Sequence, residues 1–325
     1  VTIIGFGREG LAASRFMVER GARVTVSDAR TAEQLADNVG LARGLPINYV
    51  LGGNRIEDTV EADLVVVSPG VPLDIPAIMA AQGAGVPITS ETKLFVTLCP
   101  APIVGITGSS GKTTTTFLIK SILDTAGQRA GRIGTRYHVI GGEVAPAQNT
   151  TPFALEVYRL LRQMVEKGDR AVVMEVTSHA LVLDRVHGID FRLAVFTNLT
   201  RDHLNFHKTE RAYFDAKALL FENLRPESGA QAILNADDPA SVELARRTRA
   251  PVITYGLTAD ADVRSDRYVT DWQGTQMEVE TPAGRLDLRS NLKGLFNVSN
   301  LLAAVAAGIA LGIDPDHVRQ GLLNV

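Results

Sequence analysis

A glycine-rich stretch, GITGSSGKTTTT at residues 105–116, carries the residue types that hold phosphate groups. Glycines let consecutive backbone amides approach an anion, while Lys112 offers a positive charge to β- and γ-phosphates and Thr113 a hydroxyl to Mg²⁺. The strict P-loop pattern has glycine where Ile106 stands. Four threonines restrict χ1 at the start of the next helix, so packing alone explains them poorly. The stretch predicts an ATP or GTP site formed by Gly108, Ser109, Ser110, Gly111, Lys112, Thr113 and Thr114.

Acidic and histidine side chains follow two later apolar runs. Glu175 ends VVME, a position at which P-loop folds commonly hold Mg²⁺ with a carboxylate. An acid at a strand end can also be merely solvated, so this position alone leaves both interpretations open. Asp202 and His203 lie in TNLTRDHLNFH, after another apolar run. Taken alone, His203 would be an ordinary surface histidine.

A lysine interrupts the apolar face of the helix predicted for TERAYFDAKALLF, with a cap near Thr209. One face of that helix would carry Tyr213, Phe214, Lys217, Leu220 and Phe221. Extension of the lysine stem to the surface is one explanation. The other is a partly buried Lys217 with a depressed pKa. A neutral amine can react with CO₂ to give a carbamate, which is an anionic oxygen ligand for Mg²⁺.

A second glycine pattern, GFGREG, places Gly5, Gly7 and Gly10 between a strand and a helix, and Asp28 ends the next strand. This context fits a turn that brings a pyrophosphate to a helix N-terminus. Spacing alone does not separate a nicotinamide dinucleotide from a UDP-linked sugar, and a purely structural turn is a third interpretation. By itself the region favours a dehydrogenase. SPGV, residues 68–71, ends a third strand at the same edge and offers a further phosphate contact.

Short β-branched runs alternate with helical patterns along the chain, as in VTIIG, RVTVSD, PIVGITG and RLAVFTN. This alternation predicts an α/β fold with parallel sheets covered by helices. Two prolines in LCPAP mark a boundary. We therefore expect a Rossmann-like domain over residues 1–98 and a P-loop NTPase-like central domain over residues 99–325. Residues 251–290 show turn signals without a helix period, which predicts an antiparallel excursion with a small sheet.

The composition excludes several classes of protein. The 325 residues are 45% apolar and 21% charged, as in an ordinary globular protein. The net charge of −3 argues against a nucleic-acid partner. Cys99 is the single cysteine, which excludes an internal disulfide and a cysteine-cluster metal site. No apolar run reaches the length of about 18 residues that a membrane span needs. We expect a cytoplasmic monomer.

Together these motifs resemble the Mur ligase family, the ATP-dependent enzymes that build the peptidoglycan stem peptide. Residues 101–325 carry GITGSSGKTTTT, MEVTSHALVLDRV, FTNLTRDHLNFH, AYFDAKALLF and LKGLFNVSN in the family's order. They most resemble the central domain of the enzymes that add the third residue, L-lysine or meso-diaminopimelate. Residues 1–98 instead resemble the N-terminal domain of the D-glutamate-adding ligase, through GFGREGLAASRF, VVVSPGVPLDIP and SETKLF. Such a combination is a natural mosaic or an engineered chimera.

The resemblance implies roles for the nucleotide-side residues. Lys112 and the loop amides would hold the ATP phosphates, and Thr113 and Glu175 would serve one Mg²⁺. His203 and a carbamylated Lys217 would serve a second Mg²⁺. The residues that match the family's asparagines near the adenosine are Asn297 and Asn300.

The resemblance also implies a UDP-N-acetylmuramoyl-peptide as substrate. In the first domain the matching positions are Gly7, Arg8, Glu9, Asp28, Arg30 and Gly70. In the second they are Thr150, Thr151, Ser178 and Arg185. Two departures affect the part that recognises the peptide. Leu183 stands where the third-residue enzymes often carry glutamine, and Thr177 replaces a common serine.

The implied reaction is an amide ligation. The substrate carboxylate attacks the γ-phosphate of ATP, giving an acyl phosphate and ADP, and the incoming amine then displaces phosphate. The N-terminal resemblance favours addition of D-glutamate to UDP-N-acetylmuramoyl-L-alanine, because that domain sets how long a UDP-linked substrate can fit. The central resemblance favours the alternative, third-residue addition.

Two further expectations concern activity. The family's C-terminal domain, which closes over ATP and holds the incoming amino acid, would follow GLLNV, so we expect weak or no turnover from these two domains. A non-catalytic nucleotide-binding mosaic is the alternative from another class. The resemblance displaces the dehydrogenase interpretation.

Overall fold

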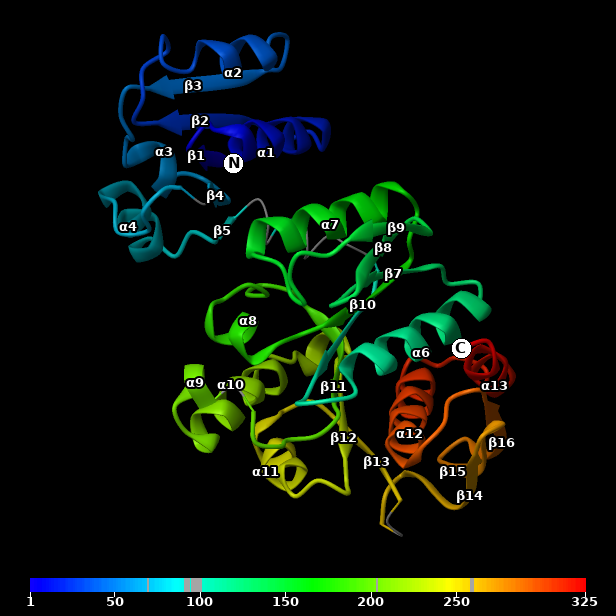
Figure 1. The fold of residues 1–325 in the computed structure, drawn as a ribbon. Coiled ribbons are helices and arrows are strands. Elements are labelled where there is room, and N and C mark those ends of the chain that lie inside the picture. Colours follow the sequence, from blue (N-terminus) through cyan, green and yellow to red (C-terminus); the bar gives the residue numbers. More distant parts are fainter. Residues whose placement is uncertain (69, 91–93, 95–100, 203, 258–259) are drawn as a thin grey trace. The chain divides into compact units, whose positions relative to one another are not determined.

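The computed structural model describes residues 1–68, 70–90, 94, 101–202, 204–257 and 260–325. The chain divides into two compact units, Val1–Leu98 and Cys99–Val325. Each unit has its own sheet, and the units are coloured blue to cyan and teal to red (Figure 1). No helix in the described part of the chain is long and apolar enough to span a membrane.

The first unit is built on a parallel sheet of order β3-β2-β1-β4-β5. Its strands are β1 (Thr2–Ile4), β2 (Val24–Asp28), β3 (Ile47–Leu51), β4 (Val65–Val67) and β5 (Ile88–Ser90). Its helices are α1 (Arg8–Glu19), α2 (Ala36–Leu41), α3 (Glu57–Val60) and α4 (Pro76–Gly83). Successive residues of β1, Ile3 and Ile4, enter different apolar clusters, because side chains of a strand alternate between faces. Both faces are therefore covered, which confirms the Rossmann-like fold.

The second unit is built on a mixed sheet of order β16-β15-β14-β13-β12-β11-β6-β10-β7-β8-β9. Its strands are β6 (Ile103–Thr107), β7 (Ala130–Ile133), β8 (Tyr137–Ile140), β9 (Glu143–Pro146), β10 (Ala171–Glu175), β11 (Phe191–Phe196), β12 (Gln231–Asn235), β13 (Val252–Gly256), β14 (Val263–Asp271), β15 (Gly274–Thr281) and β16 (Gly284–Ser290). Its helices are α6 (Lys112–Thr125), α7 (Ala154–Glu166), α8 (Ser178–Val182), α9 (Leu204–His207), α10 (Glu210–Glu222), α11 (Ala240–Arg247), α12 (Leu295–Ala310) and α13 (Pro315–Leu323), with a 3₁₀ turn at Pro226–Ser228.

The expected antiparallel excursion over residues 251–290 is shorter than predicted. Val252–Gly256 pairs in parallel with β12, and antiparallel pairing begins only at β14. β14 also pairs in parallel with β13, so its hairpins extend the central sheet. This pairing gives partners to backbone groups of β13 that would otherwise lie at an open sheet edge.

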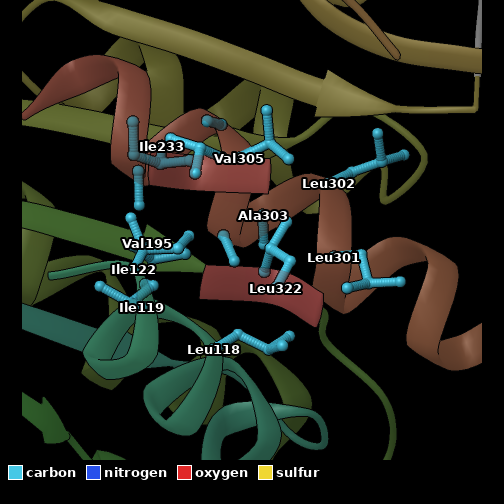
Figure 2. Close-up of a cluster of buried hydrophobic side chains, with 14 of the residues drawn as sticks. Leu118, Ile119, Ile122, Val195, Ile233, Leu301, Leu302, Ala303, Val305 and Leu322 are labelled. Carbon is cyan, nitrogen blue, oxygen red and sulfur yellow. The ribbon is translucent and has the colours of Figure 1, made fainter. Parts of the chain in front are cut away.

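One large apolar cluster packs α6, α12 and α13 against the sheet, and Figure 2 shows side chains of β11 and β12 meeting those helices. Leu302 of α12 and Ile122 of α6 are fully buried in it. The helices approach closely because small residues face the contact. A Cβ on Gly321 of α13 would lie 2.6 Å from the Cα of Ile122. The helix that follows the phosphate-binding motif is thus fixed along its length.

The strand order reverses at β6, which lies between β10 and β11. From β6 the chain passes through α6 to β7, beyond β10, whereas β11 lies on the opposite side of β6. Ligands of open α/β sheets bind outside the carboxyl ends of the strands at such a point. The loops that follow β6, β10 and β11 meet there.

Candidate functional site

The phosphate-binding loop, residues 108–111, joins β6 to α6. Gly108 (φ 151°) and Gly111 (φ 83°) have left-handed backbone conformations. A Cβ on Gly108 would lie 1.9 Å from Thr197 Oγ1, and one on Gly111 would lie 2.5 Å from Asn300 Oδ1. Gly111 caps α6 without a side-chain hydrogen bond. The first amides of any α-helix have no acceptor within the helix. Because no capping side chain accepts from them in α6, these amides remain suited to an anion.

Asn198, which the sequence interpretation did not single out, holds the other half of this loop. Its backbone carbonyl accepts from Ser109 N at 2.9 Å, and its Oδ1 accepts from Ser110 N at 2.9 Å. Thr197 Oγ1 donates to Ser110 O at 2.6 Å. The signal was available, because Asn198 follows β11, the neighbour of β6. Two of the amides expected to bind phosphate therefore donate within the protein.

Lys112 lies over its own loop. Its Nζ donates to Gly108 O at 2.7 Å and to Ser109 O at 3.1 Å. Burial lowers the pKa of Lys112, while the carboxylates of Glu175 and Asp202 act in the opposite direction. The ammonium group thus stands beside the phosphate-binding loop, as the pattern predicts.

Glu175 and Thr113 come together at the carboxyl ends of β10 and β6, where Thr113 Oγ1 donates to Glu175 Oε2 at 2.9 Å. Glu175 is only 1% exposed, so it is not a solvated strand end. Thr135 donates to it twice, from its amide to Oε1 and from its hydroxyl to Oε2, both at 2.9 Å. Arg132 forms an ion pair with Oε1 at 3.1 Å. Neither Thr135 nor Arg132 was anticipated from the sequence.

Lys217 is buried in α10 and 2% exposed, which excludes extension of its stem to the surface. Thr209 caps this helix by accepting from Ala212 N at 3.1 Å, as expected. Lys217 Nζ donates to Gly108 O at 2.9 Å and lies 4.4 Å from the centre of the Tyr213 ring. Burial holds the pKa of Lys217 well below its ordinary value, and the nearby Lys112 charge lowers it further.

The donors near Thr113 and Glu175 suit Mg²⁺. A hydroxyl and a carboxylate are hard oxygen ligands, and Mg²⁺ is commonly held by one or two carboxylates together with substrate phosphates and water. In the described part of the chain no cluster of three or more His, Cys, Asp or Glu residues could hold a metal by itself. His203, expected at a second Mg²⁺, lies outside the described residues.

A cavity of about 450 Å³ adjoins the loop and contains most of the expected substrate positions of the second unit. Its lining is Ser109, Ser110, Gly111, Lys112, Thr113, Thr114, Thr135, Asn149, Thr150, Thr151, Glu175, Thr177, His179 and Arg185. Thr151 Oγ1 donates to Glu175 O at 2.9 Å, which ties the substrate side to the Glu175 strand. Ser178 is buried instead, with its Oγ 2.9 Å from His207 Nε2.

Arg185 stands in the wall of this cavity. Its Nη1 donates to Thr151 O at 3.0 Å, and its guanidinium stacks 4.3 Å from the centre of the Phe153 ring. Its Nε is buried and has no acceptor among the described residues. A buried N–H without an acceptor is costly, and the guanidinium as a whole gives this cavity wall a positive charge.

Asn297 and Asn300 lie in the first turns of α12 and are both buried. Asn300 Nδ2 donates to Asn297 Oδ1 at 3.0 Å, and Thr115 Oγ1 donates to Asn300 Oδ1 at 3.4 Å. The pair thus stands against the phosphate-binding loop at Gly111.

In the first unit Asp28 organises the GFGREG turn. Its carboxylate accepts from Phe6 N at 2.6 Å and from Arg30 N, Nε and Nη2 at 2.8, 3.0 and 2.7 Å. Burial would raise the pKa of Asp28, but the hydrogen bonds from Arg30 and Phe6 outweigh it and hold the pKa below its ordinary value. Four donors fill the acceptor sites of a carboxylate, which leaves little capacity for a ribose hydroxyl.

The remaining positions expected to hold UDP lie around this turn. Gly7 is the N-cap of α1, which begins with Arg8 and Glu9. A Cβ on Gly10 would lie 1.9 Å from Gly5 O, so the turn and the helix approach as the fingerprint requires. A Cβ on Gly70 would meet no atom within 4 Å.

A second, larger cavity of about 900 Å³ lies on β14–β16 and α13. Three of its four arginines are paired with carboxylates: Arg267 and Arg285 with Glu278, and Arg319 with Asp316. None of the motif residues lines it, so the cavity beside the phosphate-binding loop is the candidate site.

Comparisons with known proteins agree with this geometry. Residues 106–308 match the Mur ligase middle domain, and residues 1–90 match the Mur ligase MurD-like N-terminal domain. Among curated relatives, the UDP-N-acetylmuramoyl-L-alanyl-D-glutamate--2,6-diaminopimelate ligase of Geobacter metallireducens is 43% identical over 225 residues, or 68% of this chain and 44% of the relative. The ligases of the same name from Bacillus velezensis and Gloeobacter violaceus are 45% and 48% identical, and 46% and 44% of their lengths are covered.

Solved structures give the same result. A structure of a diaminopimelate ligase of the same name matches 81% of this chain and 60% of its own, with a TM-score of 0.65 and 25% identity. MurF from Acinetobacter baumannii shares the fold, with a TM-score of 0.59 and 20% identity over 92% of this chain and 62% of its own. The chain spans about half the length of the curated relatives it matches. The phosphate-binding loop, the carboxylate beside it and both family matches place this chain in the Mur ligase family.

Proposed function

We propose that this chain forms the nucleotide- and UDP-substrate-binding part of an ATP-dependent ligase that adds meso-diaminopimelate to UDP-N-acetylmuramoyl-L-alanyl-D-glutamate. The observation that carries the proposal is the juxtaposition of Thr113, Glu175 and Arg185 in one cavity beside the phosphate-binding loop. The choice of amino acid is supported by the curated relatives, which are named for this reaction. Addition of D-glutamate, the reaction expected from the N-terminal motifs, is not supported.

The loop side of the cavity binds the nucleotide. The first-turn amides of α6 and the Lys112 ammonium hold the β- and γ-phosphates and orient the γ-phosphate for attack. Charge collects on the phosphoryl oxygens as the bond to ADP breaks, and fixed positive groups stabilise that charge. Mg²⁺, held by Thr113 and Glu175, supplies further charge neutralisation when it is bound. Asn297 and Asn300 fix the loop from behind and contact the adenosine side.

The opposite side binds the UDP-linked peptide. Arg185 places its guanidinium charge beside the carboxylate that will be phosphorylated, and Thr150 and Thr151 line the approach. Holding carboxylate and γ-phosphate in one cavity converts their encounter into an intramolecular step. The product of that step is an acyl phosphate, whose carbonyl the incoming amine attacks. Ser178, through His207, supports this wall from within.

Lys217 and the first unit have separate roles in the proposal. A carbamate on Lys217, with His203, is the proposed set of protein ligands for a second Mg²⁺. The GFGREG turn of the first unit binds the UDP pyrophosphate, with Arg30 held in place by Asp28. Because Asp28 already accepts four N–H groups, it has little capacity left for a ribose hydroxyl, and binding of a nicotinamide dinucleotide is therefore disfavoured.

Calorimetric titration tests the substrate. The purified chain, with a non-hydrolysable ATP analogue and Mg²⁺, is titrated with UDP-N-acetylmuramoyl-L-alanyl-D-glutamate and separately with the shorter L-alanine compound. We expect the longer ligand to bind at least tenfold more tightly. Arg185→Gln should remove most of this preference and leave the affinity for the ATP analogue unchanged. Equal binding of the two ligands, or tighter binding of the shorter one, would contradict third-residue addition.

Hydroxylamine trapping of an acyl phosphate tests the reaction itself. With ATP and the longer ligand we expect a hydroxamate of the substrate, formed without any amino acid. Lys112→Met should abolish it, while Lys120→Met, which changes an ion-paired lysine two turns along the same helix, should not. Nucleotide binding without trapped product would favour a non-catalytic binding module. NAD should not bind.

A further inference from the structure

Arg132 is a fully buried cation that no motif accounts for. It lies on β7 with 0% exposure, and its Nε donates to Thr116 Oγ1 at 2.8 Å. Its Nη1 donates to Tyr137 O at 2.9 Å, and its guanidinium lies 3.8 Å from the centre of the Phe117 ring. With the Glu175 ion pair, these contacts fix the guanidinium on every side. Arg132 thus links α6, β8 and β10.

The two oxygens of Glu175 have donors of different kinds. Oε1 accepts from the Arg132 guanidinium and from the Thr135 amide, at 3.1 and 2.9 Å. Oε2 accepts from the hydroxyls of Thr113 and Thr135, both at 2.9 Å. The space around Oε1 is also tight, because a Cβ on Gly134 would lie 2.3 Å from it.

These donors differ in how readily they release the carboxylate. An amide or a guanidinium locked by other contacts cannot turn away, whereas a hydroxyl rotates about its C–O bond and can accept instead of donate. A cation that takes the place of the two hydroxyl protons would therefore bind Oε2 and leave Oε1 unchanged. Such a cation would meet a Glu175 carboxylate whose negative charge is already paired with Arg132.

We propose that Arg132 positions Glu175 and sets the metal affinity of the site: it fixes Oε1, leaves Oε2 as the metal ligand, and keeps Mg²⁺ affinity low until the phosphates of a nucleotide arrive. In a buried setting a fixed positive charge opposes a divalent cation strongly. A nucleotide brings negative charge that restores the balance, so metal and nucleotide bind together. This inference rests on the proposed function of the same site.

The test measures metal binding by the nucleotide-free chain. Mn²⁺, which accepts the same oxygen ligands, is titrated and followed by electron paramagnetic resonance. The unsubstituted chain should bind it only at millimolar concentration. Arg132→Met and Arg132→Gln remove the charge, and each should tighten Mn²⁺ binding at least tenfold. Arg132→Lys keeps the charge and should stay within threefold of the unsubstituted chain.

Two controls test whether a change in Mn²⁺ affinity comes from the Arg132–Glu175 ion pair. Arg136→Met removes the same charge from an exposed position four residues away and should leave Mn²⁺ affinity unchanged. Combining Arg132→Met with Glu175→Gln should cancel the gain, because the freed carboxylate is then absent. Circular dichroism checks that each variant is folded.

Three results overturn the proposal: unchanged Mn²⁺ affinity in folded Arg132→Met or Arg132→Gln, an equal gain in Arg136→Met, or micromolar Mn²⁺ binding by the unsubstituted chain. The last result needs no variant, so the proposal stays testable even if both neutral variants fail to fold. ATP binding with Mg²⁺ is measured on the same samples. Its absence from the unsubstituted chain counts against the proposed function, whereas normal ATP binding with unchanged Mn²⁺ affinity in the variants counts only against the role of Arg132.

Discussion

Lys112 and Lys217 donate to the same acceptor, the carbonyl oxygen of Gly108, at 2.7 and 2.9 Å. One lysine belongs to the phosphate-binding helix and the other to α10, more than a hundred residues later in the chain. Two ammonium groups on one carbonyl repel each other, and Lys217 is the more deeply buried. Of the two, Lys217 is therefore the group whose pKa is lowered further. This makes it a candidate for chemistry that needs a neutral amine.

The first prediction concerns stability and pH. Since burial lowers the pKa of Lys217 in the folded chain, the unfolded chain binds one more proton between that pKa and the ordinary lysine value near 10.4. Stability should therefore rise with pH in this window, by at most about 1.4 kcal/mol per unit from this one group. Lys217→Met should reduce this rise, as measured by urea unfolding in CO₂-free buffer from pH 7.5 to 9.5, while the buried Lys112 keeps its own contribution. Lys208→Met, at an exposed position, is the control, and an unchanged pH slope in Lys217→Met refutes the assignment.

The second prediction concerns the carbamate. Because burial lowers the pKa of Lys217 and favours its neutral amine, which reacts with CO₂, the chain in ¹³C-bicarbonate should show a carbamate carbonyl signal by NMR. Lys217→Arg should lose that signal, and Lys208→Arg should retain it. Acidification should erase the signal, because a carbamate decomposes when its nitrogen is protonated. A signal that survives in Lys217→Arg would place the carbamate elsewhere.

Parts of this site follow from the sequence because they depend on strand ends and helix faces. Thr113 and Glu175 end up together because the carboxyl ends of adjacent parallel strands meet at one sheet edge. The burial of Lys217 follows from its place on an apolar helix face. Both inferences need only periodicity and the direction of the chain.

Arg132 could not be found in that way. Arg132 occupies a four-residue strand, too short for a period to show which face is buried, and its partners lie on three other elements. Asn198 follows a strand end and could have been found in that way, but its backbone and side-chain bonds to Ser109 and Ser110 are evident only in the structure. The expectation of D-glutamate addition, which the curated relatives do not support, arose because the GFGREG motif describes how a pyrophosphate meets a helix and contains no information about the peptide end of the substrate.

The third prediction separates backbone strain from steric fit at the two ends of α6. Gly111 and Gly127 have similar backbones, with φ of 83° and 74°. Alanine at either position should cost about 1 kcal/mol of stability through strain alone. Only at Gly111 would the new Cβ meet a neighbour, Asn300 Oδ1, at 2.5 Å. Gly111→Ala should therefore also lose ATP binding, at least tenfold by calorimetry, whereas Gly127→Ala should bind ATP normally.

A double substitution completes that comparison. Adding Asn300→Ala to Gly111→Ala removes the atom that the new Cβ would meet, so part of the lost stability should return. If Gly111→Ala and Gly127→Ala lower stability equally and both bind ATP, the contact with Asn300 does not constrain the loop.

The fourth prediction concerns Asp28 and acid sensitivity of the first unit. Hydrogen bonds from Arg30 and Phe6 hold the pKa of Asp28 below its ordinary value, so its stabilisation is present above the unfolded-state value near 3.9 and is lost as the pH falls through the folded-state value. Asp28→Asn should cost about 2 kcal/mol of stability near pH 6, since hydrogen bonds to a charged acceptor are lost, and this difference should shrink toward pH 3.

Hydrogen exchange of peptides within residues 1–30 measures the stability of the first unit directly. Tryptophan fluorescence would not, because the single tryptophan, Trp272, lies in the second unit. Asp37→Asn, at an exposed position, should exchange as the unsubstituted chain does. A gap between Asp28→Asn and the unsubstituted chain that stays constant down to pH 3 would show that the carboxylate charge is not what holds the turn.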